Sequence, residues 1–399
     1  AQDIADLNFI GFNQDSKCLA LGHRTGYAIF NLSNVLNEQP VPQFECEKSP
    51  DTILVERLFS SSLLAVISRK NPRSVIVYHF VNRQAISDLK FSTSVLNVKL
   101  NRDRIVVCLE EAIHVHNIRD TRLMHSILNT PANRHGMIDL STCENPSLLA
   151  YPGSTTSGQV NIFDAKSLNA VNSFMAHENP LSALRFNNEG SKIATASSKG
   201  TVIRVFSVPM GTRLFEFQRG VRPCAIHSLC FSPNSTYLAS SSSTETIHIY
   251  KLQKPEEGTA DSSANEGWMS YFQKTAQSYL PVSEFMREKD FAEAHLPASN
   301  KTIATIVSMN GQDYVLVAST DGFLYCFRIP YDGGQCELLK QHRLETKALR
   351  RSPSVDGEQF RSTPIRPPRS GDTPRSTLGG GPPDTSDMDQ FPPMGHASH

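Results

Sequence analysis

The stretch Pro180-Leu181-Ser182-Ala183-Leu184-Arg185-Phe186-Asn187 has a counterpart in Ile226-His227-Ser228-Leu229-Cys230-Phe231-Ser232-Pro233. Each stretch is followed by a run of small and apolar residues, at 192–197 and at 237–242, and then by a third alternating run. Short runs of β-branched and aromatic residues bounded by polar turns are typical of β-strands. Their recurrence at roughly 40 residues predicts the blades of a β-propeller.

The same order of runs occurs over 9–30 and over 96–116, so the repeat is not confined to the middle of the chain. Seven units follow one another, at about 7–46, 51–91, 94–128, 136–174, 180–217, 225–295 and 301–343. Antiparallel blades arranged radially leave only short, protected sheet edges. The Trp-Asp dipeptide of many WD40 repeats is absent from the sequence. We therefore expect an all-β, seven-bladed β-propeller of degenerate WD40-like repeats.

Two segments interrupt this rhythm. The sixth unit carries an insertion at about 253–290, and after about residue 345 the chain becomes rich in Pro, Ser, Gly and Arg. Such a composition buries too little apolar surface to fold. We expect a propeller over 1–344 and a disordered tail over 345–399. The tail is close to neutral, so it is not a polybasic anchor, and its Ser-Pro and Thr-Pro pairs are either kinase sites or chance occurrences.

The composition excludes a protein that is drawn to its target by overall charge. Lysine and arginine number 39, as do aspartate and glutamate, so any attraction to phosphate must be local. The eight cysteines are scattered without a C-x-x-C pair, which favours buried reduced thiols over disulfides. No secretory segment or membrane-spanning apolar run occurs. We expect a soluble cytoplasmic protein that is monomeric in solution and does not bind nucleic acid.

The segment Phe217-Gln218-Arg219-Gly220 lies between the fifth and sixth units. With one change it resembles the Phe/Leu-Arg-Arg-Gly signature of the PROPPIN family, the WIPI-type β-propellers of autophagy. The resemblance implies an effector of phosphatidylinositol 3-phosphate and 3,5-bisphosphate that is peripheral on phagophore (preautophagosomal) and endosomal membranes. The family has Arg where this chain has Gln218.

Arginine suits phosphate because its planar guanidinium can bond two oxygens at once. Successive residues of a strand point to opposite sides, so a doubled arginine can serve two separate pockets. The resemblance implies two phosphoinositide sites. The first site comprises Ser197, Thr201, Arg204 and Gln218, and the second site comprises Arg219, Ser242, Thr246 and His248.

The two sites are expected to differ in strength. Gln218 donates hydrogen bonds without a charge, which weakens the first site by on the order of tenfold. The second site, around Arg219, is then the stronger one. The alternative is that Arg204 and Arg219 are ordinary surface arginines on the rim of a propeller.

The insertion holds the only tryptophan in the chain. On a helix, Trp268, Phe272, Ala276 and Tyr279 would share one face. Aromatic and methionine side chains suit a lipid interface, and the resemblance implies a membrane-inserting loop in the sixth blade. The residues predicted to insert are Trp268, Met269, Tyr271, Phe272, Tyr279 and Leu280. The alternative is a helix packed against the side of the propeller.

The third unit offers candidates for protein binding. The resemblance implies that the second and third blades engage acidic or helical segments of other autophagy proteins, namely a lipid-transfer protein and a conjugation scaffold. Arg102 and Arg119 lie at strand ends there. Both arginines could instead be turn residues paired with Asp103 and Asp120.

Catalytic and metal-binding motifs are not found. The sequence has no phosphate-binding G-x-x-x-x-G-K-[ST] loop, H-E-x-x-H helix or G-x-S-x-G elbow. His114 and His116 alternate along one predicted strand. We favour the interpretation that they are packed strand histidines over the alternative that they bind a metal. We expect neither an enzyme nor a cofactor or metal. The alternative function is a scaffold of the WD40 type that binds only proteins and keeps a vestigial lipid site.

Overall fold

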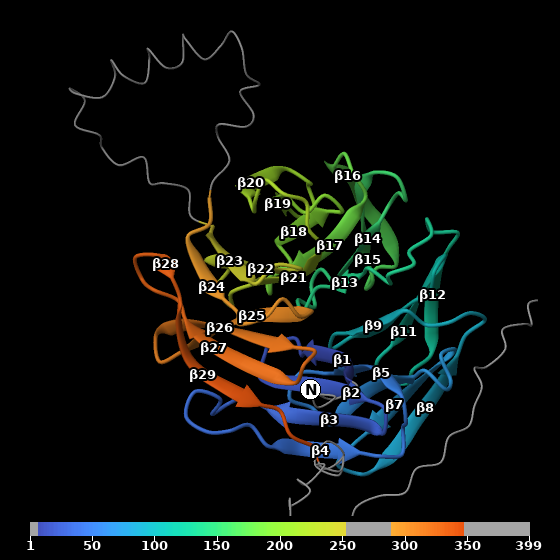
Figure 1. Ribbon diagram of the computed structural model, residues 1–399. Helices are drawn as coiled ribbons and strands as arrows, with labels where there is room; N and C mark the ends of the chain where they lie inside the picture. Colours follow the sequence, from blue (N-terminus) through green and yellow to red (C-terminus); the bar gives the residue numbers. More distant parts are fainter. Residues whose placement is uncertain (1–6, 253–288, 347–399) are drawn as a thin grey trace, which may run out of the picture. The chain divides into compact units, whose positions relative to one another are not determined.

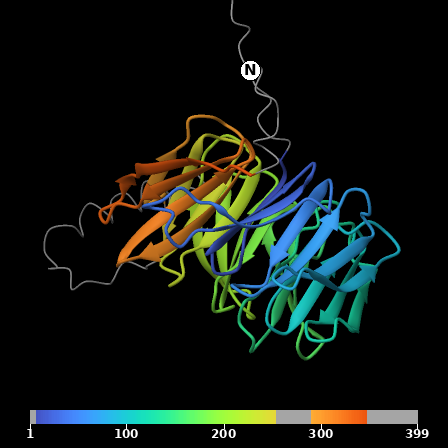
Figure 2. The ribbon, with the colours of Figure 1, turned by 90° about the horizontal axis from the view of Figure 1, so that it is seen from below.

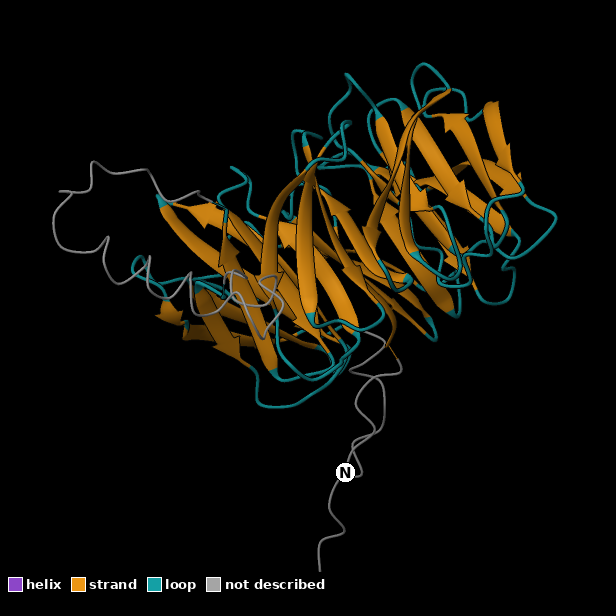
Figure 3. Cartoon of the chain, turned by 90° about the horizontal axis from the view of Figure 1, so that it is seen from above, coloured by secondary structure: helices purple, strands orange, loops and turns teal. Residues whose placement is uncertain are grey.

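The computed structural model describes residues 7–252 and 289–346, and every regular element in these ranges is a β-strand (Figure 3). The strands form seven sheets. Figure 1 shows the first strands of the sheets, such as β1, β9 and β21, near the centre and the fourth strands outside. The chain is therefore a seven-bladed β-propeller, as predicted. Within the described ranges, no helix is long and apolar enough to span a bilayer.

Blades 1 to 4 each take four consecutive strands in antiparallel order. These strands are β1 (Leu7–Phe12), β2 (Cys18–His23), β3 (Gly26–Asn31) and β4 (Pro42–Cys46); β5 (Thr52–Arg57), β6 (Leu63–Ser68), β7 (Ser74–His79) and β8 (Gln84–Lys90); β9 (Asn97–Leu100), β10 (Arg104–Cys108), β11 (Ala112–Asn117) and β12 (Leu123–Leu128); β13 (Asp139–Leu140), β14 (Leu148–Pro152), β15 (Gly158–Asp164) and β16 (Asn169–His177).

Blades 5 to 7 follow the same plan with one addition. Their strands are β17 (Leu181–Phe186), β18 (Lys192–Ser197), β19 (Val202–Ser207) and β20 (Arg213–Gln218); β21 (Ile226–Phe231), β22 (Tyr237–Ser242), β23 (Thr246–Lys251) and β24 (Ala292–His295); β25 (Thr302–Met309), β26 (Gln312–Ser319), β27 (Phe323–Arg328) and β29 (Glu337–Arg343). The short β28 (Gly334–Gln335) comes from the β27–β29 connection and pairs in parallel with β24. It covers the outer edge of blade 6.

The burial of each strand follows its place in the blade. All six residues of β2 and of β22 are buried, because the second strand of a blade is covered on both faces. Strands covered on both faces read as continuous apolar or small runs rather than as alternating ones. The outer strand β8 is mostly exposed. Apolar clusters shared by neighbouring blades fill the space between the sheets.

Blade 1 and blade 7 close the ring through side chains rather than through a shared strand. Each is built from one continuous part of the chain, and Figures 1 and 2 show the first (blue) and last (orange) blades side by side. One apolar cluster joins Leu19 and Phe30 to Leu316 and Leu324. His342 also contacts the Val35 carbonyl, at 2.6 Å from its Nε2.

The predicted units agree closely with the blades. All eight cysteines are free thiols, five of them buried, which confirms the reduced state favoured from the sequence. The sixth unit is interrupted between β23 and β24, as expected. Residues 253–288 and 347–399 lie outside the described residues, so the disordered tail and the inserted amphipathic stretch stay predictions.

Candidate functional site

The Phe217–Gly220 segment ends β20. Phe217 is fully buried, and its ring stacks on Tyr250 of blade 6 with 4.7 Å between centroids. Gln218 is the last residue of the strand, opposite Val202 of β19. Arg219 follows directly, and its amide donates to the carbonyl of Thr201 at 2.9 Å. The buried Phe217 ring therefore anchors the end of β20 and positions the two polar residues that follow it, Gln218 and Arg219.

The side chain of Arg219 holds two loops together. Its Nε donates to the carbonyl of Gly200 at 2.9 Å, and its Nη2 donates to the carbonyl of Arg222 at 2.6 Å. Gly200 has φ +64°, and a Cβ there would lie 1.9 Å from the carbonyl oxygen of Cys224, so only glycine fits this crossing. Arg219 is 8% exposed. Within residues 7–252 and 289–346, no ion pair to Arg219 is seen, and its side-chain bonds go to backbone carbonyls.

Strand alternation sends Gln218 and Arg219 to different faces of blade 5. Phe217 and Ile203 pack into the cluster shared with blade 6. Arg204 lies on the other face, where its Nη1 donates to the carbonyl of Ala176 in blade 4 at 2.7 Å. Gln218 shares the Arg204 face by its register. Arg219 acts electrostatically on His248 of blade 6. The first site thus faces blade 4, and the second faces blade 6.

The first site contains an acid that the sequence analysis missed. Arg204 Nε lies 2.7 Å from Glu216 Oε2, and the same oxygen lies 2.8 Å from Arg213 Nη1. Ser197 and Thr201 are buried beside the turn that joins β18 to β19. Gln218 Nε2 donates to the carbonyl of Gly220 at 2.6 Å. Glu216 therefore offsets the charge of Arg204, the one arginine of this site.

His177 lies beneath the first site. It is 5% exposed, and its Nε2 is 2.9 Å from the hydroxyl of Thr195. Burial, together with the nearby charge of Arg204, lowers the pKa of His177 to about 4. The ring is therefore neutral at physiological pH and adds no positive charge to the site.

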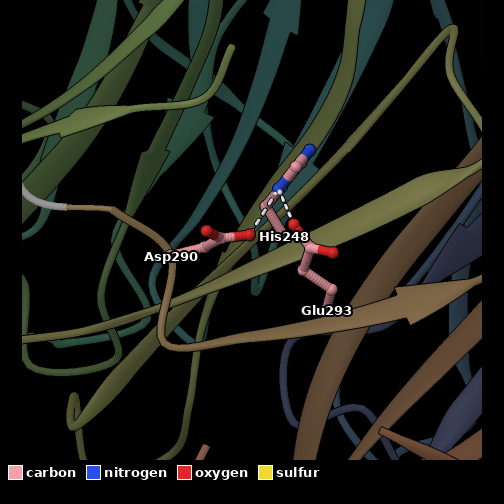
Figure 4. A group of neighbouring side chains, drawn as sticks. All are labelled: His248, Asp290 and Glu293. Carbon is pink, nitrogen blue, oxygen red and sulfur yellow. Dashed lines mark hydrogen bonds and ion pairs between the residues drawn. The ribbon is translucent and has the colours of Figure 1, made fainter. Parts of the chain in front are cut away.

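The second site lies where β22 and β23 meet the loop of Arg219. Ser242 is buried, with its hydroxyl 2.9 Å from that of Thr244. His248 Nδ1 lies 2.8 Å from Asp290 Oδ2 (Figure 4). Burial lowers the pKa of His248, and the hydrogen bond to Asp290 opposes that shift. The carboxylates of Asp290 and Glu293 beside this site were missed from the sequence.

The two predicted partner-binding arginines differ in their surroundings. Arg102 lies 3.5 Å from Glu144 Oε1, and its guanidinium sits 4.4 Å from the centroid of the Phe59 ring. Arg102 forms its ion pair with Glu144. The alternative that it pairs with Asp103 was therefore wrong. Arg119 is exposed, and its backbone amide donates to Asn117 Oδ1 at 3.1 Å. Both remain predictions as partner contacts.

Two other groups of ionisable residues are engaged within the fold. His114 and His116 bond to the Ser126 hydroxyl and the Thr121 carbonyl, and both rings lie against Phe91, which agrees with packed strand histidines. A small polar pocket lies among the inner strands, away from the two sites. Its charges form pairs, Glu56 with Lys99 and Asp139 with Arg185.

The residues predicted to insert into membranes lie outside the described residues, so their arrangement is not part of the site described above. The described side chains supply hydroxyls, an amide, an imidazole and two guanidiniums at the ends of neighbouring strands. Such groups can bind an anion reversibly, through hydrogen bonds and charge.

The fold and the site define a β-propeller whose strand ends carry a polar binding surface, a class of binding protein rather than of enzyme. The PROPPIN family profile matches residues 6–345. The chain therefore belongs to the PROPPIN family.

Named relatives and solved structures agree with this assignment. The chain is 44% identical over 410 residues to Autophagy-related protein 18 of Caenorhabditis elegans, covering 98% of this chain and 97% of the relative. It is 45% identical over 348 residues to WD repeat domain phosphoinositide-interacting protein 2 of Gallus gallus, covering 85% and 79%. KlAtg21, solved in complex with the coiled coil of AgAtg16, has a TM-score of 0.68 at 25% identity, covering 85% and 100%. Kluyveromyces lactis Hsv2 has a TM-score of 0.68 at 21% identity, covering 86% and 100%, and shows the shared fold.

Proposed function

We propose that the protein is a phosphoinositide effector of autophagy. It binds phosphatidylinositol 3-phosphate, and also the 3,5-bisphosphate, on phagophore and endosomal membranes, and it recruits autophagy proteins there. Membership of the PROPPIN family and the names of the relatives support this function. Binding makes and breaks no covalent bond.

The observation that carries the proposal is that Gln218 and Arg219 lie in two different sites. The two residues lie on opposite faces of blade 5. Buried Ser197 and Thr201 of blade 5 lie beside the first site, and Ser242 and Thr246 of blade 6 lie beside the second. Hydroxyls and forked N–H donors around an open surface are the groups that bind a phosphate monoester. Two such sites on one rim fit two lipid headgroups of the same bilayer.

We further propose that the propeller covers 1–344, that 253–290 is the membrane-inserting loop of blade 6, and that 345–399 is a disordered tail. Insertion of a large apolar side chain contributes roughly 1.5–3 kcal/mol. Joined to two weak headgroup sites, such insertion raises affinity through effective concentration.

For protein partners, we propose that Arg102 and Arg119 contact an autophagy conjugation scaffold or a lipid-transfer protein. Both arginines lie at strand ends of blade 3, and Arg119 is exposed. Support comes from KlAtg21, whose solved complex contains a coiled coil of AgAtg16. A helical segment with acidic residues suits two arginines.

Flotation of the full chain with vesicles tests the proposed function. Vesicles of neutral lipid are compared with vesicles that also contain phosphatidylinositol 3-phosphate, the 3,5-bisphosphate, or the 4-phosphate at equal charge. We expect co-flotation only with the two 3-phosphorylated lipids. Recovery on none of the vesicles would favour the rival function, a scaffold that binds proteins alone and keeps a vestigial lipid site. Equal recovery on all of them would show membrane binding without headgroup specificity and would also contradict the proposal.

A further inference from the structure

A group of metal-ligating side chains lies on blade 6, where β23 and β24 pair. His248 is opposite Glu293, and Thr246 is opposite His295. Residues two apart on a strand point to the same side, so these four side chains share one face. It is the face turned toward blade 5, because Tyr250, on the same side as His248, packs into the cluster shared with that blade.

The ligand atoms of three of these side chains converge. His248 Nδ1 lies 2.8 Å from Asp290 Oδ2 and 3.7 Å from Glu293 Oε1. One nitrogen and two carboxylate oxygens lie within 4.8 Å of one another. Figure 4 shows both carboxylates beside the same ring nitrogen, with the other ring nitrogen pointing away from them. Ligands of a tetrahedral zinc ion are about 3.3 Å apart, given bonds of about 2.0–2.1 Å, so a small opening between His248 and Asp290 would admit the ion.

A second histidine contacts this group from outside. His295 Nε2 lies 3.6 Å from Glu293 Oε2, the carboxylate oxygen that does not face His248. Its other ring nitrogen, Nδ1, lies 3.3 Å from the Thr246 hydroxyl. Such outer contacts orient the ligands of a zinc ion. The group therefore offers one nitrogen and two carboxylates, and His295 positions one of the carboxylates.

Arg219 lies near this group and acts electrostatically on His248. In the described part of the chain, its Nε and Nη2 donate to the carbonyls of Gly200 and Arg222 rather than to the two carboxylates. The carboxylate oxygens of Asp290 and Glu293 therefore stay directed at His248 Nδ1.

We propose that His248, Asp290 and Glu293 form a zinc-binding site on the face of blade 6 turned toward blade 5, with His295 positioning Glu293. Imidazole together with carboxylate suits Zn²⁺, whereas Mg²⁺ and Ca²⁺ prefer oxygen ligands alone. Asp290 comes just after residues 253–288, so a bound ion fixes the point where the chain returns to blade 6. The site stands on its own geometry and does not depend on lipid binding, although His248 belongs to both.

Zinc competition measures the site directly. The full chain, freed of metal, is titrated with Zn²⁺ against a chromophoric chelator, and Asp290→Asn, Glu293→Gln and their double variant are titrated alongside. We expect the wild type to bind one more equivalent than the double variant. Each single variant should hold that equivalent at least tenfold more weakly, since loss of even an outer partner costs about 10–100-fold. Mg²⁺ should not displace the zinc.

The control is Glu337→Gln, which removes an exposed carboxylate paired with Arg328 in blade 7. It should bind zinc as the wild type does, and this comparison also accounts for cysteines and other histidines of the chain. The thermal midpoint of every variant is measured without metal to establish folding. Zinc should raise the midpoint of the wild type and of Glu337→Gln only. Equal zinc binding by all the proteins, or none by the wild type at micromolar zinc, would overturn the proposal.

Discussion

The two faces of blade 5 carry sites that resemble each other in sequence and differ in electrostatics. On the face toward blade 4, Arg204 is held at 2.7 Å by Glu216, and the motif supplies the neutral Gln218. On the face toward blade 6, Arg219 is bonded to backbone carbonyls, which leave its full positive charge in place. Each predicted site contains one arginine, so the number of arginines does not distinguish the two sites. Because Arg204 is paired with Glu216 whereas Arg219 bonds to carbonyls, and the carboxylates beside the second site contact His248 instead, we predict that the second site is the stronger one.

The largest expected effect comes from Arg219→Thr. Hydrogen bonds to a charged group contribute about 1.5–3 kcal/mol, so we expect affinity for vesicles with phosphatidylinositol 3-phosphate to fall at least tenfold. Arg119→Thr removes the same charge from blade 3 and should bind lipid as the wild type does. Because Arg219 also joins two loops, thermal melts of both variants must accompany the titration, and Arg219→Lys should fall between wild type and Thr. Full affinity in a folded Arg219→Thr protein would contradict the prediction that the second site is the stronger one.

Gln218→Arg tests the other half of the motif. The change restores a charged fork on the face of the first site, and it should raise vesicle affinity by about tenfold. A surface plasmon resonance titration over immobilised vesicles measures it. The matched control is Gln218→Lys, which adds the charge without the planar fork and should gain less. If neither variant binds more tightly, the first site does not take part in lipid binding.

A smaller gain is expected from Glu216→Gln. The change releases Arg204 from its carboxylate, and a partly exposed ion pair of this kind contributes up to about 1 kcal/mol. Affinity should therefore rise by about two- to fivefold. Glu337→Gln, which breaks an ion pair on blade 7, is the control for the change in net charge. A loss of affinity in Glu216→Gln would show that Glu216 positions Arg204 for the lipid instead of competing with it.

Lowering the pH should reduce the free energy of unfolding more through His177, beneath the first site, than through His248 of the second site. His177 has a folded pKa of about 4 against an ordinary 6.5, so its neutral form is favoured in the native state. That contribution is complete above pH 6.5 and is lost as the pH falls toward 4, up to about 3 kcal/mol. Urea unfolding across this range should show a shallower pH dependence in His177→Gln. His248→Gln should change the slope less, because Asp290 opposes the lowering of the His248 pKa. A larger change in His248→Gln would reverse this ranking.

Much of the fold could be predicted because each blade repeats the same short alternating runs. The strand ends at Ser197 and Ser242 followed from the repeat, and so did the interruption between β23 and β24. The pairing of Arg204 with Glu216 could have been predicted from the strand register, because the two residues are cross-strand partners. A bulge between Val205 and Phe206 shifts that register and hides it from simple counting.

Other features depend on contacts between distant parts of the chain. The carbonyls that bind Arg219 come from a turn about 20 residues earlier and from its own loop, and no local pattern marks them. Asp290 reaches His248 only because the chain returns to blade 6 after a long insertion. The alternation Ala292-Glu293-Ala294-His295 did place Glu293 and His295 on one face, which was the signal available for the proposed zinc site.

The most direct test of two unequal sites is a calorimetric titration of the full chain with the soluble headgroup inositol 1,3-bisphosphate. The wild type should show two classes of site that differ in affinity by about tenfold. Arg219→Thr should lose the tighter class and keep the weaker, whereas Arg204→Thr should do the opposite. A single class of site in the wild type, or loss of the tighter class in Arg204→Thr, would contradict the account.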